Sequence, residues 1–331
     1  MKSLSLLITY ICLSSFLAAQ GIDSKDSGKP IIKIFANYHH GISDDAIQET
    51  AFEVRRAYIG YQHNFDNHWK TAIKLDIGSP GDLSEYALLR RYAYFKNAYI
   101  QYTNKRWKIG AGLVGMLHIG YPEKIWGHRY VMKEFQDKHK LGSSADIGIF
   151  SQYHLNDLIT LDIFMVNGEG YKNLQRDNIY KYGGGISLKP FTGSVARFHY
   201  DLTPKEIIQH SFSCILSYTI KDKMTIGAEG VYQINSHSQE DADIYGYSVF
   251  GLYHLNEKWE LFIRYDKLAS NILQGEPTPW NLAKDGTSII GGIQYHPNSF
   301  LKFALNYQDW FSYAQNGPNK SYIYLNMEIA F

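Results

Sequence analysis

From residue 31 to the C-terminal residue, apolar and polar residues alternate with a period of two in one segment after another. Successive side chains of a β-strand point to opposite faces, so each such segment has one apolar and one polar face. The last segment has apolar residues at every second position: Ile323, Leu325, Met327, Ile329 and Phe331. Sixteen segments with this pattern predict strands at 31–41, 51–63, 68–78, 95–104, 106–116, 144–154, 158–166, 179–189, 191–201, 208–220, 224–234, 244–255, 258–269, 286–296, 299–309 and 320–331.

The connections between these segments alternate in length. Seven are short turns, at 64–67, 105, 155–157, 190, 221–223, 256–257 and 297–298. Eight are longer loops, at roughly 42–50, 79–94, 117–143, 167–178, 202–207, 235–243, 270–285 and 310–319. An up-and-down barrel with tight turns at one rim and longer loops at the other produces this alternation. The pattern therefore predicts an all-β fold, an antiparallel barrel of about 16 strands.

Aromatic residues lie at the short-turn ends of the predicted strands. Tyr precedes the short turns and Trp follows them, at Tyr61, Tyr102, Tyr153, Tyr218, Tyr253 and Tyr295, and at Trp69, Trp107 and Trp259. Tyr is a good strand former, which explains its abundance but not this placement. Amphipathic rings collect at the membrane–water boundary, and strands of ~9–13 residues suit a tilted bilayer crossing. We therefore predict a transmembrane barrel integral to a bacterial outer membrane, with short periplasmic turns, longer extracellular loops and an aqueous lumen.

The first 20 residues have the pattern of an export signal. Lys2 precedes an apolar run at 4–17, and small residues follow at Ala18 and Ala19. We predict a signal peptide at 1–20, a polar periplasmic linker at 21–30 and the barrel, contacting outer-membrane lipid, at 31–331. Without Lys2, 32 basic residues stand against 32 acidic ones. A balance of zero does not favour a nucleic-acid partner.

The polar faces of the strands carry charges of both signs, which suit a wet lumen or cross-strand ion pairs. The loop 118–143 adds basic residues and four aromatics, so we expect it to fold into the lumen as a constriction rather than remain exposed. A basic constriction favours anions. The predicted pore-lining and constriction residues are Arg55, Lys74, Lys108, Arg129, Lys133, Lys181, Arg197, Arg264 and Lys302. Adjacent Arg55 and Arg56 should face opposite ways unless a bulge re-aims one of them.

Catalytic signatures are absent from the sequence. It contains neither G-x-S-x-G nor H-E-x-x-H, and five His are spread over four short turns. We predict no enzyme activity, no catalytic residue, no cofactor and no metal site. The alternatives to a porin are an outer-membrane barrel enzyme acting on lipid and a plugged, structural barrel.

Several segments resemble the phosphate-selective porin O and P family, in the version found in Bacteroidetes-type bacteria. They are FEVRRAYIGY (52–61), LDIG (75–78), KNAYIQY (96–102), GSSADIG (142–148), NGEGYKN (167–173) and YGGGISLKP (182–190). The resemblance implies a sixteen-stranded outer-membrane porin, often a homotrimer, that passes small hydrophilic solutes or anions. The last strand, which ends at Phe331, resembles the terminal strand of bacterial outer-membrane barrels in general, which implies that Phe331 acts as a signal to the barrel assembly machinery.

Overall fold

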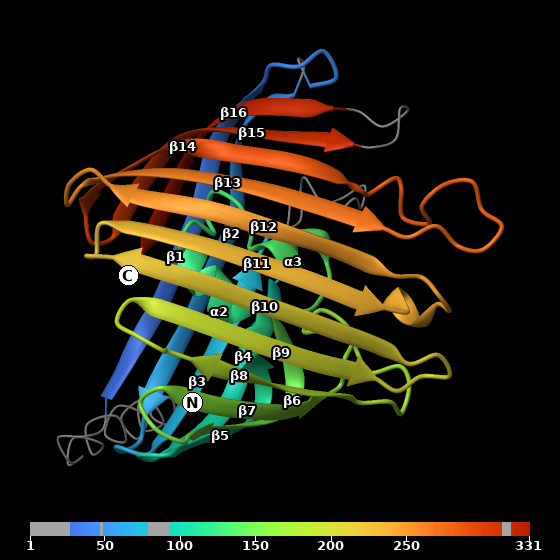
Figure 1. Ribbon diagram of the computed structural model, residues 1–331. Helices are drawn as coiled ribbons and strands as arrows, with labels where there is room; N and C mark the ends of the chain where they lie inside the picture. Colours follow the sequence, from blue (N-terminus) through green and yellow to red (C-terminus); the bar gives the residue numbers. More distant parts are fainter. Residues whose placement is uncertain (1–26, 47–48, 79–92, 313–318) are drawn as a thin grey trace, which may run out of the picture.

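The chain folds into one closed antiparallel sheet of sixteen strands (Figure 1). The computed structural model describes residues 27–46, 49–78, 93–312 and 319–331, so the predicted signal peptide at 1–20 lies outside the described residues. All sixteen predicted strands are confirmed. Their bounds are β1 Ser27–Gly41, β2 Thr50–Asn64, β3 Trp69–Ile77, β4 Ala93–Thr103, β5 Trp107–Gly115, β6 Ala145–His154, β7 Ile159–Val166, β8 Lys181–Leu188, β9 Ser194–Thr203, β10 Gln209–Ile220, β11 Met224–Ile234, β12 Ile244–His254, β13 Trp259–Ser270, β14 Gly286–Asn298, β15 Leu301–Ser312 and β16 Lys320–Ala330.

The barrel closes by pairing its first strand with its last. β1 pairs with β2 on one side and with β16 on the other. Ile32 and Phe331 exchange two backbone hydrogen bonds, of 2.9 and 3.0 Å. Because β1 already begins at Ser27, the last four residues of the predicted linker at 21–30 belong to the barrel. Both ends of the described chain lie at the short-turn rim, since Ser27 pairs with Asn64 beside the first short turn.

The short turns share one local device. The side chain of an Asx residue accepts hydrogen bonds from the backbone N–H groups two and three residues later, at Asp66, Asn104, Asn156 and Asn256. Such a side chain satisfies the backbone of a tight turn locally and returns the chain antiparallel to itself. This explains why N or D recurs in these turns of the sequence.

The aromatic residues at the short-turn rim face outward in cross-strand pairs. Trp107 packs on Tyr153 and Trp259 on Tyr295, each with ring centroids 4.5 Å apart, and Trp69 packs on Tyr102 at 5.1 Å. The register puts the two members of each pair directly opposite one another. Most other large apolar side chains of the strands are also exposed on the outer face. A face of this kind is typical of a surface that contacts lipid.

The segment between β5 and β6 lies inside the barrel. It contains helices α2 (Leu117–Trp126) and α3 (Phe135–His139), which the ring of strands encloses in Figure 1. Trp126, Tyr130 and Val131 form a buried cluster with apolar residues of the inner wall, among them Phe250 and Phe262. The apolar core of this molecule is therefore the contact between loop and wall. No helix in the described part of the chain is long and apolar enough to cross a membrane.

Candidate functional site: a basic constriction inside the barrel

A β-bulge in β2 turns two adjacent arginines toward the lumen. Phe35 of β1 pairs with Arg56, whereas Ala36 pairs with Val54, so Arg55 is the extra residue. Val54 remains exposed on the outer face, and both Arg55 and Arg56 line the same cavity. The bulge resolves the conflict that strict alternation poses for two consecutive arginines, because it inserts one residue without flipping the flanking ones.

A second bulge places Lys96 in the lumen. Lys74 of β3 pairs with Asn97 and Leu75 pairs with Phe95, which leaves Lys96 as the extra residue of β4. Its Nζ donates to the Ser144 hydroxyl and lies 4.1 Å from the centroid of the Tyr171 ring. The alternation of apolar and polar residues does not single out Lys96, because its orientation depends on this irregular pairing.

We call the segment between β5 and β6 the lumen loop. Buried polar contacts attach it to the barrel wall on the side far from β5. Arg264 of β13 donates a 2.7 Å hydrogen bond to the carbonyl oxygen of Lys133, and Lys138 Nζ lies 3.0 Å from Asp266 Oδ2. The Tyr130 hydroxyl donates to Gln294 Oε1 at 2.8 Å. Each contact satisfies a polar group that would otherwise be buried without a partner. Together they hold the loop across the lumen.

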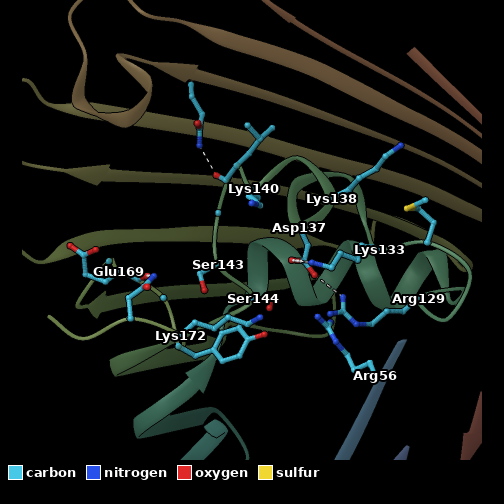
Figure 2. A pocket seen from close by; sticks show the side chains of 18 of the residues that line it. Arg56, Arg129, Lys133, Asp137, Lys138, Lys140, Ser143, Ser144, Glu169 and Lys172 are labelled. Atoms are coloured by element: carbon cyan, nitrogen blue, oxygen red, sulfur yellow. Dashed lines mark hydrogen bonds and ion pairs between the residues drawn. The ribbon is translucent and has the colours of Figure 1, made fainter. Parts of the chain in front are cut away.

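A cavity of about 960 Å³ lies between this loop and β2, β8, β10 and β11. Figure 2 shows Arg56, Arg129 and Lys133 near Asp137, with Lys138 pointing away from it and Glu169 and Lys172 on the other side. The basic lining residues are Arg55, Arg56, Arg129, Lys133, Lys138, Lys140, Lys172 and Lys181, against the carboxylates Asp137 and Glu169. Five of these cations pair with a carboxylate of the described residues, so the net positive charge around the cavity is smaller than the number of basic residues. The five are Arg56, Arg129, Lys133, Lys138 and Lys181.

Asp137 is the carboxylate at the centre of this cluster. Its oxygens lie 2.8 Å from Arg129 Nη1 and 3.2 Å from Lys133 Nζ, and Arg129 also pairs with Glu123. Burial by itself raises the pKa of Asp137, but the charges of Arg129 and Lys133 outweigh it, so the pKa lies below its usual value. Arg129 is therefore neutralised by two carboxylates, whereas Lys133 keeps a side chain that is 40% exposed.

The structure brings together four of the predicted site residues and separates the other five. Arg55, Arg129, Lys133 and Lys181 line the large cavity. Lys74 and Lys108 lie on the wall outside this cavity, and Lys302 pairs with Glu328 at 3.4 Å. The sequence predicts Arg197 and Arg264 at the pore surface, but both are almost fully buried. Arg197 makes bonds of 2.6 and 2.9 Å to Asp162, and Arg264 makes bonds of 2.7 and 2.9 Å to Asp266.

Four lysines of β3, β4 and β5 form a basic wall, by which we mean Lys70, Lys74, Lys96 and Lys108. Within the described residues, none of them has a carboxylate oxygen within ion-pair distance of 4.0 Å. Each ammonium instead lies near an aromatic ring, as Lys74 does at 5.1 Å from the centroid of Tyr58 and Lys108 does at 5.6 Å from that of Phe150. Lys70 and Lys108 line a second cavity of about 210 Å³. These four ammonium groups thus take no part in the close ion pairs that the described residues form in the lumen.

One group of side chains has the composition of a metal site. His118 of α2 approaches His199 and Asp201 of β9, and all three side chains are buried. Scattered single histidines in the sequence do not indicate this meeting, because it depends on how the loop folds against the wall.

Comparisons with known proteins agree on the fold. No family model matches the chain, and no curated protein matches it. Among solved structures, the outer-membrane channel DcaP of Acinetobacter baumannii aligns with a TM-score of 0.70 and 11% identity, covering 93% of this chain and 98% of that one. This chain has the fold of a bacterial outer-membrane porin. OmpF of Salmonella typhi in complex with daunomycin aligns with a TM-score of 0.70, 11% identity and the same coverage. The anion-selective porin from Comamonas acidovorans aligns with a TM-score of 0.68 and 10% identity, covering 93% and 100%.

Proposed function

We propose that this chain is an outer-membrane porin through which small hydrophilic solutes diffuse passively, with a preference for anions. The closed barrel satisfies its backbone internally, and its exposed apolar face with paired aromatics suits a bilayer. The loop 118–143 lies across the lumen and would narrow the path. The similarity of the fold to outer-membrane channels supports a channel function. One of the similar solved structures is described as an anion-selective porin.

The basic wall carries the proposal of anion preference. Lys70, Lys74, Lys96 and Lys108 lie on three consecutive strands, and they lack close carboxylates among the described residues. Pore-lining cations that are not neutralised by neighbours raise the local concentration of anions and repel cations. Arg197 and Arg264, by contrast, belong to ion pairs that hold the structure together.

Ion selectivity tests the proposal directly. Purified protein in a planar bilayer under a potassium chloride gradient should give a reversal potential with the sign of chloride preference. Changing all four wall lysines to Gln should move that potential toward zero. The matched control changes four exposed turn lysines, Lys105, Lys221, Lys223 and Lys258, to Gln and should retain most of the preference. Cation preference in the wild-type chain would refute the anion proposal.

The close packing of the loop favours a second candidate, a barrel with a closed lumen. Trp126, Tyr130 and Phe135 are almost fully buried between loop and wall. The same bilayer experiment separates the two candidates, because a closed barrel inserts without carrying current.

The resemblance to the phosphate-selective porin family adds a finer proposal, that phosphate added to the chloride solution reduces the chloride current. Homotrimer formation and recognition of Phe331 by the assembly machinery remain predictions.

A further inference from the structure

His118, His199 and Asp201 meet where the lumen loop first touches the barrel wall. His199 and Asp201 are two apart in β9, so both side chains point into the barrel, and His118 comes from the first turn of α2. One nitrogen or oxygen from each residue lies within 4.8 Å of the others. The rings of His118 and His199 stack with centroids 4.7 Å apart, and His199 Nε2 lies 2.9 Å from Asp201 Oδ2.

The two imidazoles are buried without the hydrogen bonds that buried nitrogens need. His118 is 4% exposed and His199 is 6% exposed. Neither ring nitrogen of His118 has a hydrogen-bond partner, and Nδ1 of His199 also has none. Leaving a buried polar atom unsatisfied costs about 1–3 kcal/mol, so native proteins rarely tolerate three in one place without a ligand. These atoms therefore point to a missing binding partner.

We propose that His118, His199 and Asp201 bind one divalent transition-metal ion, zinc being the probe, which fastens the start of the lumen loop to β9. Two imidazole nitrogens and one carboxylate oxygen are a donor set that zinc accepts, with a water or an anion as fourth ligand. Zinc with ligands at ~2.0–2.2 Å holds tetrahedral donor atoms roughly 3.4 Å apart, so a donor separation of up to 4.8 Å must contract by as much as about 1.4 Å.

Two neighbours define how an ion would enter and what it would displace. Lys181 and Gly142 lie beside the cluster and both line the large cavity, so an ion from the lumen would have to pass them. A Cβ atom at Gly142 would lie 2.6 Å from His118 Nε2, so only glycine leaves space beside that nitrogen. Lys181 Nζ lies 3.3 Å from Asp201 Oδ1 and competes with a metal ion for this carboxylate.

Calorimetric titration of the untagged, chelator-treated full chain in detergent with zinc tests the proposal. The wild-type chain should bind one zinc ion, and H118A and H199A should each weaken the affinity more than about 10-fold, since each removes a ligand. The control H154A removes an exposed histidine at the short-turn rim and should bind as the wild type does. Absence of zinc binding to the wild-type chain, or wild-type affinity in H118A or H199A, would overturn the proposal.

A further variant keeps the test sharp if the histidine variants fold poorly. K181M removes the ammonium that competes for Asp201 and should bind zinc more tightly than the wild-type chain does. Affinity unchanged or weakened in K181M would place any bound zinc elsewhere and overturn the proposal. Cobalt in place of zinc adds a spectroscopic measurement, because its visible absorption reports tetrahedral nitrogen and oxygen ligands and should disappear in H118A.

Discussion

Arg264 on the barrel wall donates a 2.7 Å hydrogen bond to the carbonyl oxygen of Lys133 in the lumen loop. The same guanidinium pairs with Asp266 and lies 5.2 Å from the centroid of the Trp126 ring. One buried side chain thus joins the wall, a carboxylate and the loop backbone.

We expect Arg264→Met to loosen the loop and to destabilise the barrel by roughly 3–5 kcal/mol, because it leaves Asp266 with Lys138 as its remaining cation. The loss of stability is measured as a decrease in the midpoint temperature of thermal unfolding in detergent. Lys302→Met is the control, because it removes a more exposed ion pair to Glu328 and should cost no more than about 1 kcal/mol. Equal shifts in the two variants would contradict the anchoring role of Arg264.

Trp126 should control the size of the path. Its ring packs between Phe250 and Phe262, and its Nε1 donates to the Met132 carbonyl oxygen at 2.9 Å. Trp126→Ala removes the largest side chain of the loop–wall contact, so we expect a higher single-channel conductance and a stability loss of about 3–5 kcal/mol. The control is Trp107→Ala on the outer face, which should leave the conductance unchanged. If Trp126→Ala also leaves the conductance unchanged, the loop does not limit the current.

Deletion of Arg55 should be tolerated. Because Arg55 is the extra residue of a bulge, its removal leaves Val54 facing out and Arg56 facing in, in regular pairing. Deletion of Val54 should instead prevent folding, since it moves Arg55 to the outward position, where a charge facing lipid is costly. The mobility of unheated protein in gel electrophoresis distinguishes folded from unfolded barrels. Failure of both deletions alike would mean that the bulge is not a separable feature.

Asp137 should limit the anion preference over a wide pH range. Its pKa in the folded chain lies below its usual value of 3.8, because Arg129 and Lys133 outweigh the effect of burial. The stabilisation from its ion pairs is therefore present above pH 3.8 and is lost as the pH falls through the lowered pKa. Asp137 itself therefore keeps its negative charge between about pH 5 and 8. Asp137→Asn should raise the chloride preference at pH 7 because it frees Lys133, and a preference unchanged or lowered would contradict this.

Periodicity alone predicts all sixteen strands, because the two faces of each strand meet lipid or a polar lumen and the residues must alternate accordingly. The Asx residues of the short turns and the outward Tyr and Trp are equally local signals. Each depends on the strand or turn that contains it, and the barrel then follows from pairing neighbours in order.

The lumen depends on contacts that no local pattern contains. Arg197 and Lys74 have the same inward orientation in the sequence pattern, yet Arg197 is buried against Asp162 and Lys74 has no close carboxylate among the described residues. Lys96 points inward because of a bulge, and His118 meets His199 because the loop folds back across the barrel. Alternation reports which face a side chain occupies, whereas its partner, and thus its effective charge, is decided by strand register and loop packing in three dimensions.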